Sequence, residues 1–139
     1  MDRVSRAKFN KALFSWHKKN YRKMAWRDTH EPYLILVSEI MLQQTQVARV
    51  KEKYAEFIKR FPRVKKLAAA PLGDVLRIWS GLGYNRRAKY LHQCAKVIAS
   101  EYEGEFPGDY DSLVKLPGIG RSTAGALLAF AFGHDTPMI

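Results

Sequence analysis

Most of the chain shows apolar residues at the three- and four-residue spacing of amphipathic helices. One face of a long helix is formed by residues that recur at i, i+3, i+7 and i+10: Ala88, Leu91, Ala95 and Ile98. The same spacing predicts further helices, over about residues 5–19, 32–48, 51–61, 64–69 and 72–79. No stretch alternates convincingly between apolar and polar residues. The pattern therefore predicts an all-α fold with short connections.

Two glycines one residue apart break this pattern in the segment 116–120, Leu-Pro-Gly-Ile-Gly. Glycine lets the backbone turn tightly and expose its N–H groups, and the apolar run over 124–131 predicts a helix immediately afterwards. The exposed N–H groups then lie at a helix N-terminus, which carries roughly +0.5 charge and suits an anion. Asp109 and Asp111 are plausible caps of a short helix that leads into the turn. The alternative is a plain glycine turn between two core helices.

The charge of the chain favours a polyanionic partner. Its 139 residues fit one domain, and 47% hydrophobic content is enough for a core. The 24 Lys and Arg against 13 Asp and Glu give a formal net charge of +11, and nucleic acid is the commonest polyanion for a compact basic chain. No run of about 18 apolar residues and no signal peptide is seen. The expected location is the cytoplasm or nucleoid, with no membrane.

The cysteine and the histidines form no metal-binding pattern. Cys94 is the only cysteine, which excludes an internal disulfide or a four-cysteine cluster within these residues. Its place on the apolar face of a helix predicts that it lies in the core. The histidines are scattered without ligand spacing, at His17, His30, His92 and His134. We therefore expect no metal ion in this chain.

A carboxylate stands inside the most apolar of the predicted helices. Glu39 follows Leu-Ile-Leu-Val at residues 34–37 and precedes Ile-Met-Leu at residues 40–42. Partial burial disfavours the ionised form and would raise the pKa of this carboxyl, which suits a general acid. The alternative is a glutamate on a narrow solvent-exposed face, paired with Arg27 or Arg49.

Polar side chains with nucleic-acid chemistry follow at two places. Residues 43–46, Gln-Gln-Thr-Gln, can read the edges of bases, although a surface run of glutamines is equally ordinary. Arg86 and Arg87 come just after Gly83 and Tyr84. We expect these arginines to contact phosphate, with a solvated helix start as the alternative.

Three motifs, in order along the chain, carry a resemblance to a known family. They are Ser-Glu-Ile-Met-Leu-Gln-Gln-Thr-Gln at 38–46, Gly-Leu-Gly-Tyr at 81–84, and Leu-Pro-Gly-Ile-Gly-Arg-Ser-Thr-Ala at 116–124. Together they resemble the MutY-type adenine DNA glycosylases of the helix-hairpin-helix (HhH-GPD) base-excision repair superfamily. The resemblance extends over roughly residues 16–139.

The resemblance implies a fold and a domain arrangement. The HhH-GPD fold has a six-helix barrel core, which residues 25–139 would form, with the helix-hairpin-helix motif at about 110–132. Residues 1–24 would be an N-terminal helix that belongs to an otherwise missing domain on the iron–sulfur side. The second helical domain would therefore be incomplete.

The resemblance also implies an activity on double-stranded DNA. A monofunctional glycosylase of this kind hydrolyses the N-glycosidic bond of adenine mispaired with 8-oxoguanine or guanine, after the adenine is flipped out of the helix. Glu39 stands at the position of the catalytic glutamate, which protonates the adenine ring. Base-pocket and lesion contacts are expected of Arg22, Trp26, Arg27, Gln43, Gln44, Thr45, Leu82, Tyr84 and Ser122. Phosphate contacts are expected of Gly118, Ile119, Gly120, Arg121, Arg86 and Arg87.

Individual positions refine the resemblance. Bifunctional relatives carry at position 122 a lysine that forms a Schiff base with the sugar, which Ser122 cannot do. Ala25 stands where the family usually has proline, and Asn85 replaces a common second tyrosine. Two alternatives remain open. One is a thymine or uracil mismatch glycosylase of the same fold, and the other is a non-catalytic helix-hairpin-helix DNA-binding module.

The end of the sequence affects the expected activity. In the family an aspartate follows a segment that matches residues 136–139, Thr-Pro-Met-Ile, and stabilises the positive charge that develops on the sugar. The sequence stops at Ile139, before that position. We therefore expect a C-terminally truncated monomer that binds DNA and excises poorly. No cofactor is expected in this chain, and a [4Fe–4S] cluster only in a longer form.

Overall fold

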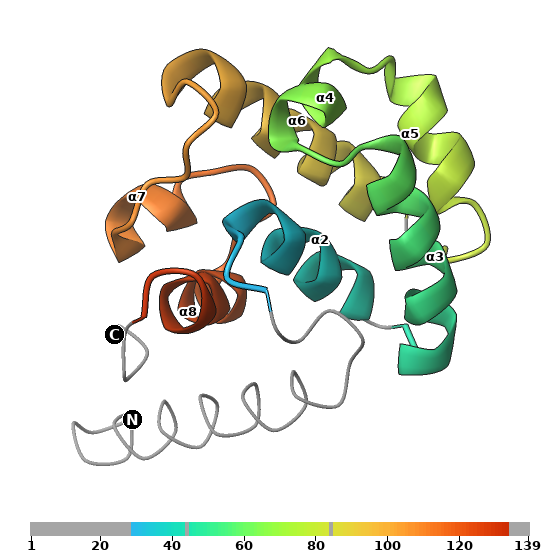
Figure 1. The fold of residues 1–139 in the computed structure, drawn as a ribbon, viewed down its shortest axis with the longest axis horizontal. Helices are drawn as coiled ribbons and strands as arrows, with labels where there is room; N and C mark the ends of the chain where they lie inside the picture. The colour runs from blue at the N-terminus through green and yellow to red at the C-terminus, as the bar shows by residue number, and fades with distance from the viewer. Residues whose placement is uncertain (1–28, 44, 84, 134–139) are drawn as a thin grey trace.

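The computed structural model describes residues 29–43, 45–83 and 85–133. These residues are helical and contain no strand. Figure 1 shows the helices, which are α2 (Pro32–Leu42), α3 (Val47–Arg60), α4 (Val64–Ala69), α5 (Leu72–Trp79), α6 (Asn85–Glu101), α7 (Tyr110–Val114) and α8 (Arg121–Phe130). The all-α prediction is confirmed. The domain boundary predicted after residue 24 lies outside the described residues.

Helix α2 lies at the centre of this arrangement. It begins where Pro32 occupies the first turn and the Glu31 side chain accepts a hydrogen bond from the Tyr33 backbone N–H. Its apolar residues are almost completely buried, with exposed fractions of 2% or less for Ile35, Leu36, Val37, Ile40 and Met41. Helices α3, α6 and α8 pack around it. Burial on several sides explains why this helix reads as a nearly continuous apolar run.

The predicted helix over 32–48 is wrong at its C-terminal end. Helix α2 stops at Leu42, Gln43 is extended, and a new helix begins only at Val47. The carbonyl oxygens of Ile40, Met41 and Gln43 accept hydrogen bonds from the Arg87 guanidinium. The Arg87 guanidinium thus donates to carbonyl oxygens that would have been paired within the helix if α2 had continued past Leu42.

Helix α6 supports the opposite side of the core. Its predicted apolar face is confirmed, because Ala88, Leu91, Ala95 and Ile98 are all buried. Helices α4 and α5 pack on it. The His92 imidazole is buried as well, and its Nε2 lies 2.8 Å from the Ala70 carbonyl oxygen at the end of α4. This hydrogen bond ties the short α4 to α6.

Aromatic rings join α3 to α5. Phe57 meets Phe61 and Trp79 edge to face, at centroid distances of 5.1 and 5.9 Å. The Tyr33 hydroxyl donates a 2.6 Å hydrogen bond to the Phe61 carbonyl oxygen, which attaches the start of α2 to the end of α3. Trp79 and Cys94 are fully buried, which confirms the predicted core position of Cys94.

Burial of the Cys94 thiol predicts a loss of stability at alkaline pH. It raises the pKa of this thiol from 9.0 to about 12, so the unfolded chain ionises first. The stabilising contribution is complete below the unfolded pKa and is lost as the pH rises toward the folded one, by about 2 kcal/mol near pH 10.5. Urea unfolding across this range should show the loss. Cys94→Ala should weaken the pH dependence, and parallel curves for the two proteins would contradict this account.

Candidate nucleic-acid interface

The glycine-containing turn between α7 and α8 is held from the inside by two apolar residues. Leu116 and Ile119 are buried, with exposed fractions of 5% and 4%, and the Ile119 N–H donates to the Leu116 carbonyl oxygen at 3.2 Å. Gly118 and Gly120 are exposed. The turn therefore presents its glycines to solvent. Ile119, expected to face phosphate, can do so only through its backbone.

The helix before the turn is capped as predicted. The Asp109 carboxylate accepts a 2.9 Å hydrogen bond from the Ser112 backbone N–H, and this bond lowers the pKa of Asp109. Asp111, the other predicted cap, instead lies in the first turn of α7. An acidic residue there is still favourable for the helix dipole.

Gly118 is required by the fold. Its φ of +76° is a conformation that side-chain-bearing residues rarely adopt. A Cβ atom at this position would also lie 2.8 Å from Cβ of Tyr90 on α6. The turn is therefore seated directly on α6.

Gly120 has a different environment. Its φ of −95° and ψ of −171° are accessible to other residues, and no atom of the described residues lies within 4 Å of a Cβ built there. It is the N-cap of α8 and makes no side-chain capping hydrogen bond. Arg121 and Ser122 follow it in the first turn and are exposed. The start of α8 is thus open to close approach by a ligand.

Glu39 lies on α2, the helix that packs against α8. Its side chain is half-buried, as predicted, between the buried residues Ser38 and Ile40. The Ser38 hydroxyl donates to the Ile35 carbonyl oxygen at 2.8 Å. The fold thus places the candidate acid on the helix that adjoins the hairpin helix.

Gln43 and Thr45 lie in the loop between α2 and α3. Gln43 is exposed, and its Nε2 lies 3.5 Å from the Thr123 hydroxyl on α8. Thr45 is half-buried, and its hydroxyl accepts a 3.0 Å hydrogen bond from Arg87 Nη2. This loop is therefore tied to two helices. Thr123, which the sequence analysis overlooked, forms one of those ties.

The two arginines at the start of α6 have different environments. Arg86 is exposed, which is compatible with its predicted phosphate contact. Arg87 is half-buried and directed into the protein, where its guanidinium donates to backbone carbonyl oxygens and lies 5.8 Å from the Trp79 ring. The guanidinium is thus engaged by the protein itself, and the expected phosphate contact of Arg87 stays a prediction.

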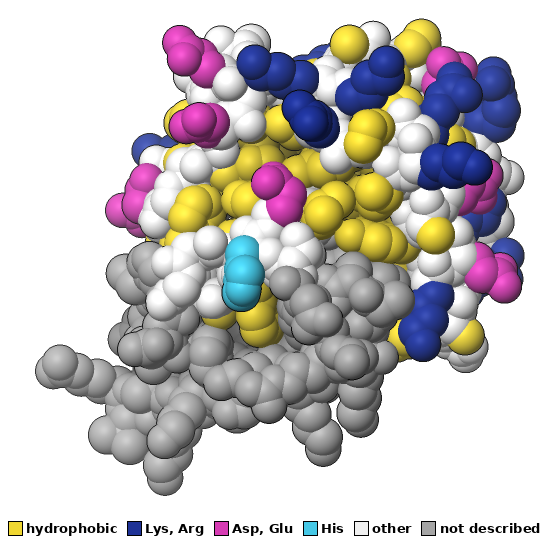
Figure 2. Space-filling view, viewed as in Figure 1, with side chains coloured by type: hydrophobic (Ala, Val, Ile, Leu, Met, Phe, Trp, Pro, Cys, Tyr) yellow, Lys and Arg dark blue, Asp and Glu magenta, His cyan; other side chains and the backbone are white. Residues whose placement is uncertain are grey.

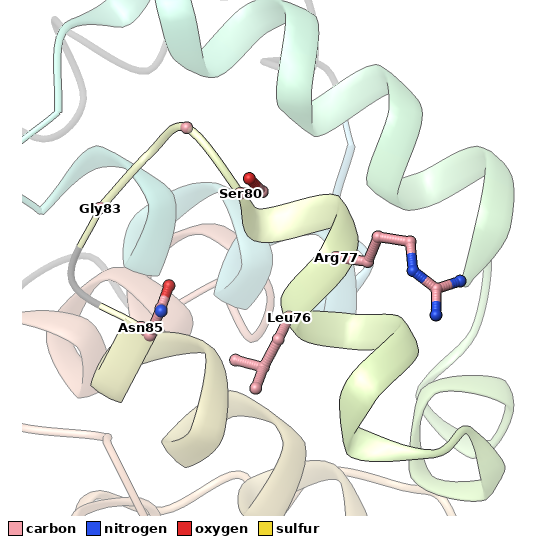
Figure 3. A pocket seen from close by; sticks show the side chains of 6 residues that line it. Leu76, Arg77, Ser80, Gly83 and Asn85 are labelled. Atoms are coloured by element: carbon pink, nitrogen blue, oxygen red, sulfur yellow. The ribbon is translucent and has the colours of Figure 1, made fainter.

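Leu82 lies in the turn between α5 and α6, where Gly81 and Gly83 have φ values of +92° and +74°. Its side chain is buried with an exposed fraction of 6%, so the described turn meets a ligand through its exposed residues Gly81 and Gly83. A hollow with a volume of 710 Å³ opens beside the turn. Figure 3 shows the side chains around it, with the Arg77 guanidinium pointing away from Gly83. The lining residues are Leu76, Arg77, Ser80, Gly81, Gly83 and Asn85.

Five of the predicted site residues lie outside the described residues: Arg22, Trp26, Arg27, Gln44 and Tyr84. Tyr90, by contrast, is a residue that the sequence analysis missed. It is 43% exposed and packs against the glycine turn. In the sequence, the feature that could have pointed to Tyr90 is its position on the predicted helix just outside the apolar face.

Basic residues are spread over the surface. On the face seen in Figure 2, Lys and Arg gather along the upper and right-hand edges, over α3, α4 and α5. Asp74 lies 3.5 Å from both Arg60 and Arg77, and these partly exposed pairs add little stability. Among the residues that the structure describes, no cluster of three His, Cys, Asp or Glu could hold a metal ion. Nor does any described helix combine the length and apolar character needed to cross a bilayer.

Comparison with known proteins identifies the family. Residues 37–139 match the HhH-GPD superfamily of base excision DNA repair proteins. The chain belongs to this superfamily. It is 46% identical to an adenine DNA glycosylase of Buchnera aphidicola subsp. Baizongia pistaciae over 89% of this chain and 36% of that protein. It is 44% identical to the adenine DNA glycosylase of Mycobacterium tuberculosis, over 91% of this chain and 42% of that protein. The chain thus spans about two fifths of the length of these relatives.

Solved structures of the superfamily share the fold. A thermostable thymine-DNA glycosylase matches with a TM-score of 0.74 and 28% identity, over 95% of this chain and 62% of that one. Endonuclease III in a non-covalent complex with DNA matches with a TM-score of 0.68 and 25% identity, over 88% of this chain and 60% of that one. The predicted HhH-GPD fold is confirmed.

The different environments of the two glycines predict different effects of alanine. Gly118→Ala should destabilise the protein by about 1–3 kcal/mol, because it combines backbone strain with a clash against Tyr90. Gly120→Ala should cost less than about 1 kcal/mol but weaken binding to a DNA duplex, since the methyl group enters the space that a phosphate would use. Urea unfolding and fluorescence anisotropy measure the two effects. Equal stability losses would contradict this distinction.

Proposed function

We propose that this chain provides the base-removing core of a monofunctional adenine DNA glycosylase, acting on adenine mispaired with 8-oxoguanine or guanine in double-stranded DNA. The observation that carries the proposal is the placement of half-buried Glu39 on α2, packed against the helix that begins at the exposed glycine turn. Membership of the superfamily and 37–48% identity to adenine DNA glycosylases support this substrate.

The glycine turn would hold the DNA backbone. A phosphate oxygen that approaches Gly120 meets the first-turn N–H groups and the positive dipole end of α8, a helix of ten residues. The exposed guanidinium of Arg121, and of Arg86 on α6, adds positive charge. These contacts are independent of base sequence, so they fix the register of the protein on the duplex without selecting the lesion.

Glu39 would supply the proton for base removal. Its carboxyl protonates a ring nitrogen of the extruded adenine, and the electron pair of the N-glycosidic bond leaves with the base. Water then adds its hydroxyl to C1′ of the sugar and releases a proton, which leaves an abasic site and free adenine. A half-buried carboxyl suits the first step, because an extruded base can reach it while the fold fixes its position.

Ser122 supports hydrolysis without strand cleavage. It is exposed in the first turn of α8, beside the proposed phosphate site. A hydroxyl cannot form the Schiff base that precedes β-elimination of the sugar, whereas a lysine amine can. The product is therefore an intact strand with an abasic site.

Single-turnover reactions with protein in excess test the proposal. We expect slow adenine release from an 8-oxoguanine:adenine duplex and a guanine:adenine duplex, with strand scission only after alkali. Glu39→Gln should slow release by about 10²–10⁴-fold, as expected for loss of a general acid, and change duplex affinity little. Glu52→Gln, an exposed glutamate on α3, is the matched control.

Other results of this assay would point elsewhere. The fold similarity to a thymine-DNA glycosylase makes a guanine:thymine duplex the informative additional substrate, and preferential release of thymine would replace adenine as the proposed base. Unchanged release by Glu39→Gln would refute the role of that carboxyl. Duplex binding with no base release by the unmodified protein would favour a non-catalytic DNA-binding module.

A further inference from the structure

Two loops from different parts of the chain both accept hydrogen bonds from one arginine side chain. The first joins α2 to α3 and contains Gln43 and Thr45, and the second joins α5 to α6 and contains Leu82 and Gly83. Arg87 on α6 contacts both. Its Nη2 lies 3.0 Å from the Thr45 hydroxyl and 3.5 Å from the Gly83 carbonyl oxygen.

The same guanidinium also closes the end of α2. Its Nη1 lies 2.9 Å from the Ile40 carbonyl oxygen and 3.2 Å from that of Met41, and donates to that of Gln43 as well. The C-terminal carbonyls of a helix carry partial negative charge, so a cation there is favourable. Arg87 therefore adds side-chain donors to the cap that the Gln43 backbone N–H already provides at the Ile40 carbonyl oxygen.

The position of Arg87 is itself fixed by rigid parts of the fold. It precedes Ala88, which is fully buried on α6, and its guanidinium carbon lies 5.8 Å from the ring centre of the buried Trp79. The first loop is also linked to the hairpin helix, since Gln43 Nε2 lies 3.5 Å from the Thr123 hydroxyl. One side chain thus sets both loops relative to each other and to the proposed phosphate site.

We propose that Arg87 is a positioning residue for lesion recognition, which holds these two loops at one fixed separation so that both act on the same distorted base pair. The proposal rests on the function proposed above. Contacts to a distorted base pair use both loops, whereas the sequence-independent phosphate contacts do not. Loops that are already ordered therefore lower the cost of binding the lesion and leave binding to undamaged DNA nearly unchanged. Loss of the link should therefore reduce the preference for the lesion more than the affinity for undamaged DNA.

Lysine at position 87 tests this role with the charge retained. Its ammonium is a compact point charge that cannot reproduce the forked set of donors, so it cannot reach both loops as well as the end of α2. Arg63→Lys is the matched control, since Arg63 is exposed and lies at the start of α4. Both variants keep the formal net charge of +11, so long-range attraction to DNA is unchanged.

The first measurement is hydrogen exchange without DNA. In Arg87→Lys we expect faster exchange of reporter amides in both loops, with α6 still protected beyond its first turn. The reporters are Gln43, Thr45, Ser80 and Leu82, whose N–H groups donate to the carbonyl oxygens of Ile40, Leu42, Arg77 and Trp79. Faster exchange in one loop alone, or in neither, would overturn the proposed link between them.

The second measurement compares affinities for an 8-oxoguanine:adenine duplex and an undamaged duplex. Arg87→Lys should reduce the ratio of the two affinities by about tenfold, as expected for the loss of one charge-assisted hydrogen bond, with affinity for undamaged DNA within about threefold of the original. Arg63→Lys should leave both affinities unchanged. An unaltered ratio in a folded Arg87→Lys protein would overturn the proposal.

The two measurements separate this proposal from the one on which it rests. If the unmodified protein shows no preference for the lesion duplex, the proposed substrate is wrong, and recognition by Arg87 fails with it. Hydrogen exchange would then still decide whether Arg87 links the loops. If the unmodified protein prefers the lesion and Arg87→Lys retains that preference, the substrate stands and only the role of Arg87 is refuted.

Discussion

The burial of α2 is the constraint on which the rest of the fold depends. Its apolar residues are surrounded by α3, α6 and α8, so most of the helix surface is removed from water. A helix buried in this way has few positions where a charged side chain can stay hydrated, and Glu39 occupies one that is half-buried. The candidate acid is therefore set into the core without being sealed inside it, which is the compromise that proton transfer to an external base requires.

The same burial creates a problem at the end of α2 that the fold solves with Arg87. Carbonyl groups of the last turn need donors, and the Gln43 backbone N–H supplies one to the Ile40 carbonyl oxygen. The Arg87 guanidinium on α6 supplies several donors at once, and its Nη2 also donates to the Thr45 hydroxyl and the Gly83 carbonyl oxygen. The requirement to satisfy one helix terminus thereby connects two loops that are far apart in the sequence. The hydrogen bonds of Arg87 therefore both stabilise the end of α2 and set the arrangement of the two loops.

Sequence pattern predicted the features that depend on neighbouring residues. The buried face of α6, the cap of α7 by Asp109 and the start of α2 at Pro32 all follow from local spacing or local hydrogen bonds. The end of α2 was predicted incorrectly and the contacts of Arg87 with that end were not predicted, because both depend on residues more than forty positions apart. The place of Arg87 just after the Gly83 turn suggested a phosphate contact, and only the fold shows that backbone carbonyl oxygens already accept its hydrogen bonds.

The two glycines of the hairpin illustrate how a motif combines separate demands. Gly118 is explained by the protein alone, since its positive φ and its contact with Tyr90 both exclude a side chain. Gly120 is not explained in this way, because its conformation is ordinary and none of the described residues fills the space that a Cβ would take. A residue whose small size serves no internal purpose points to something outside the protein. At the open N-terminus of α8, on a chain with net charge +11, a DNA phosphate is the group whose close approach would require it.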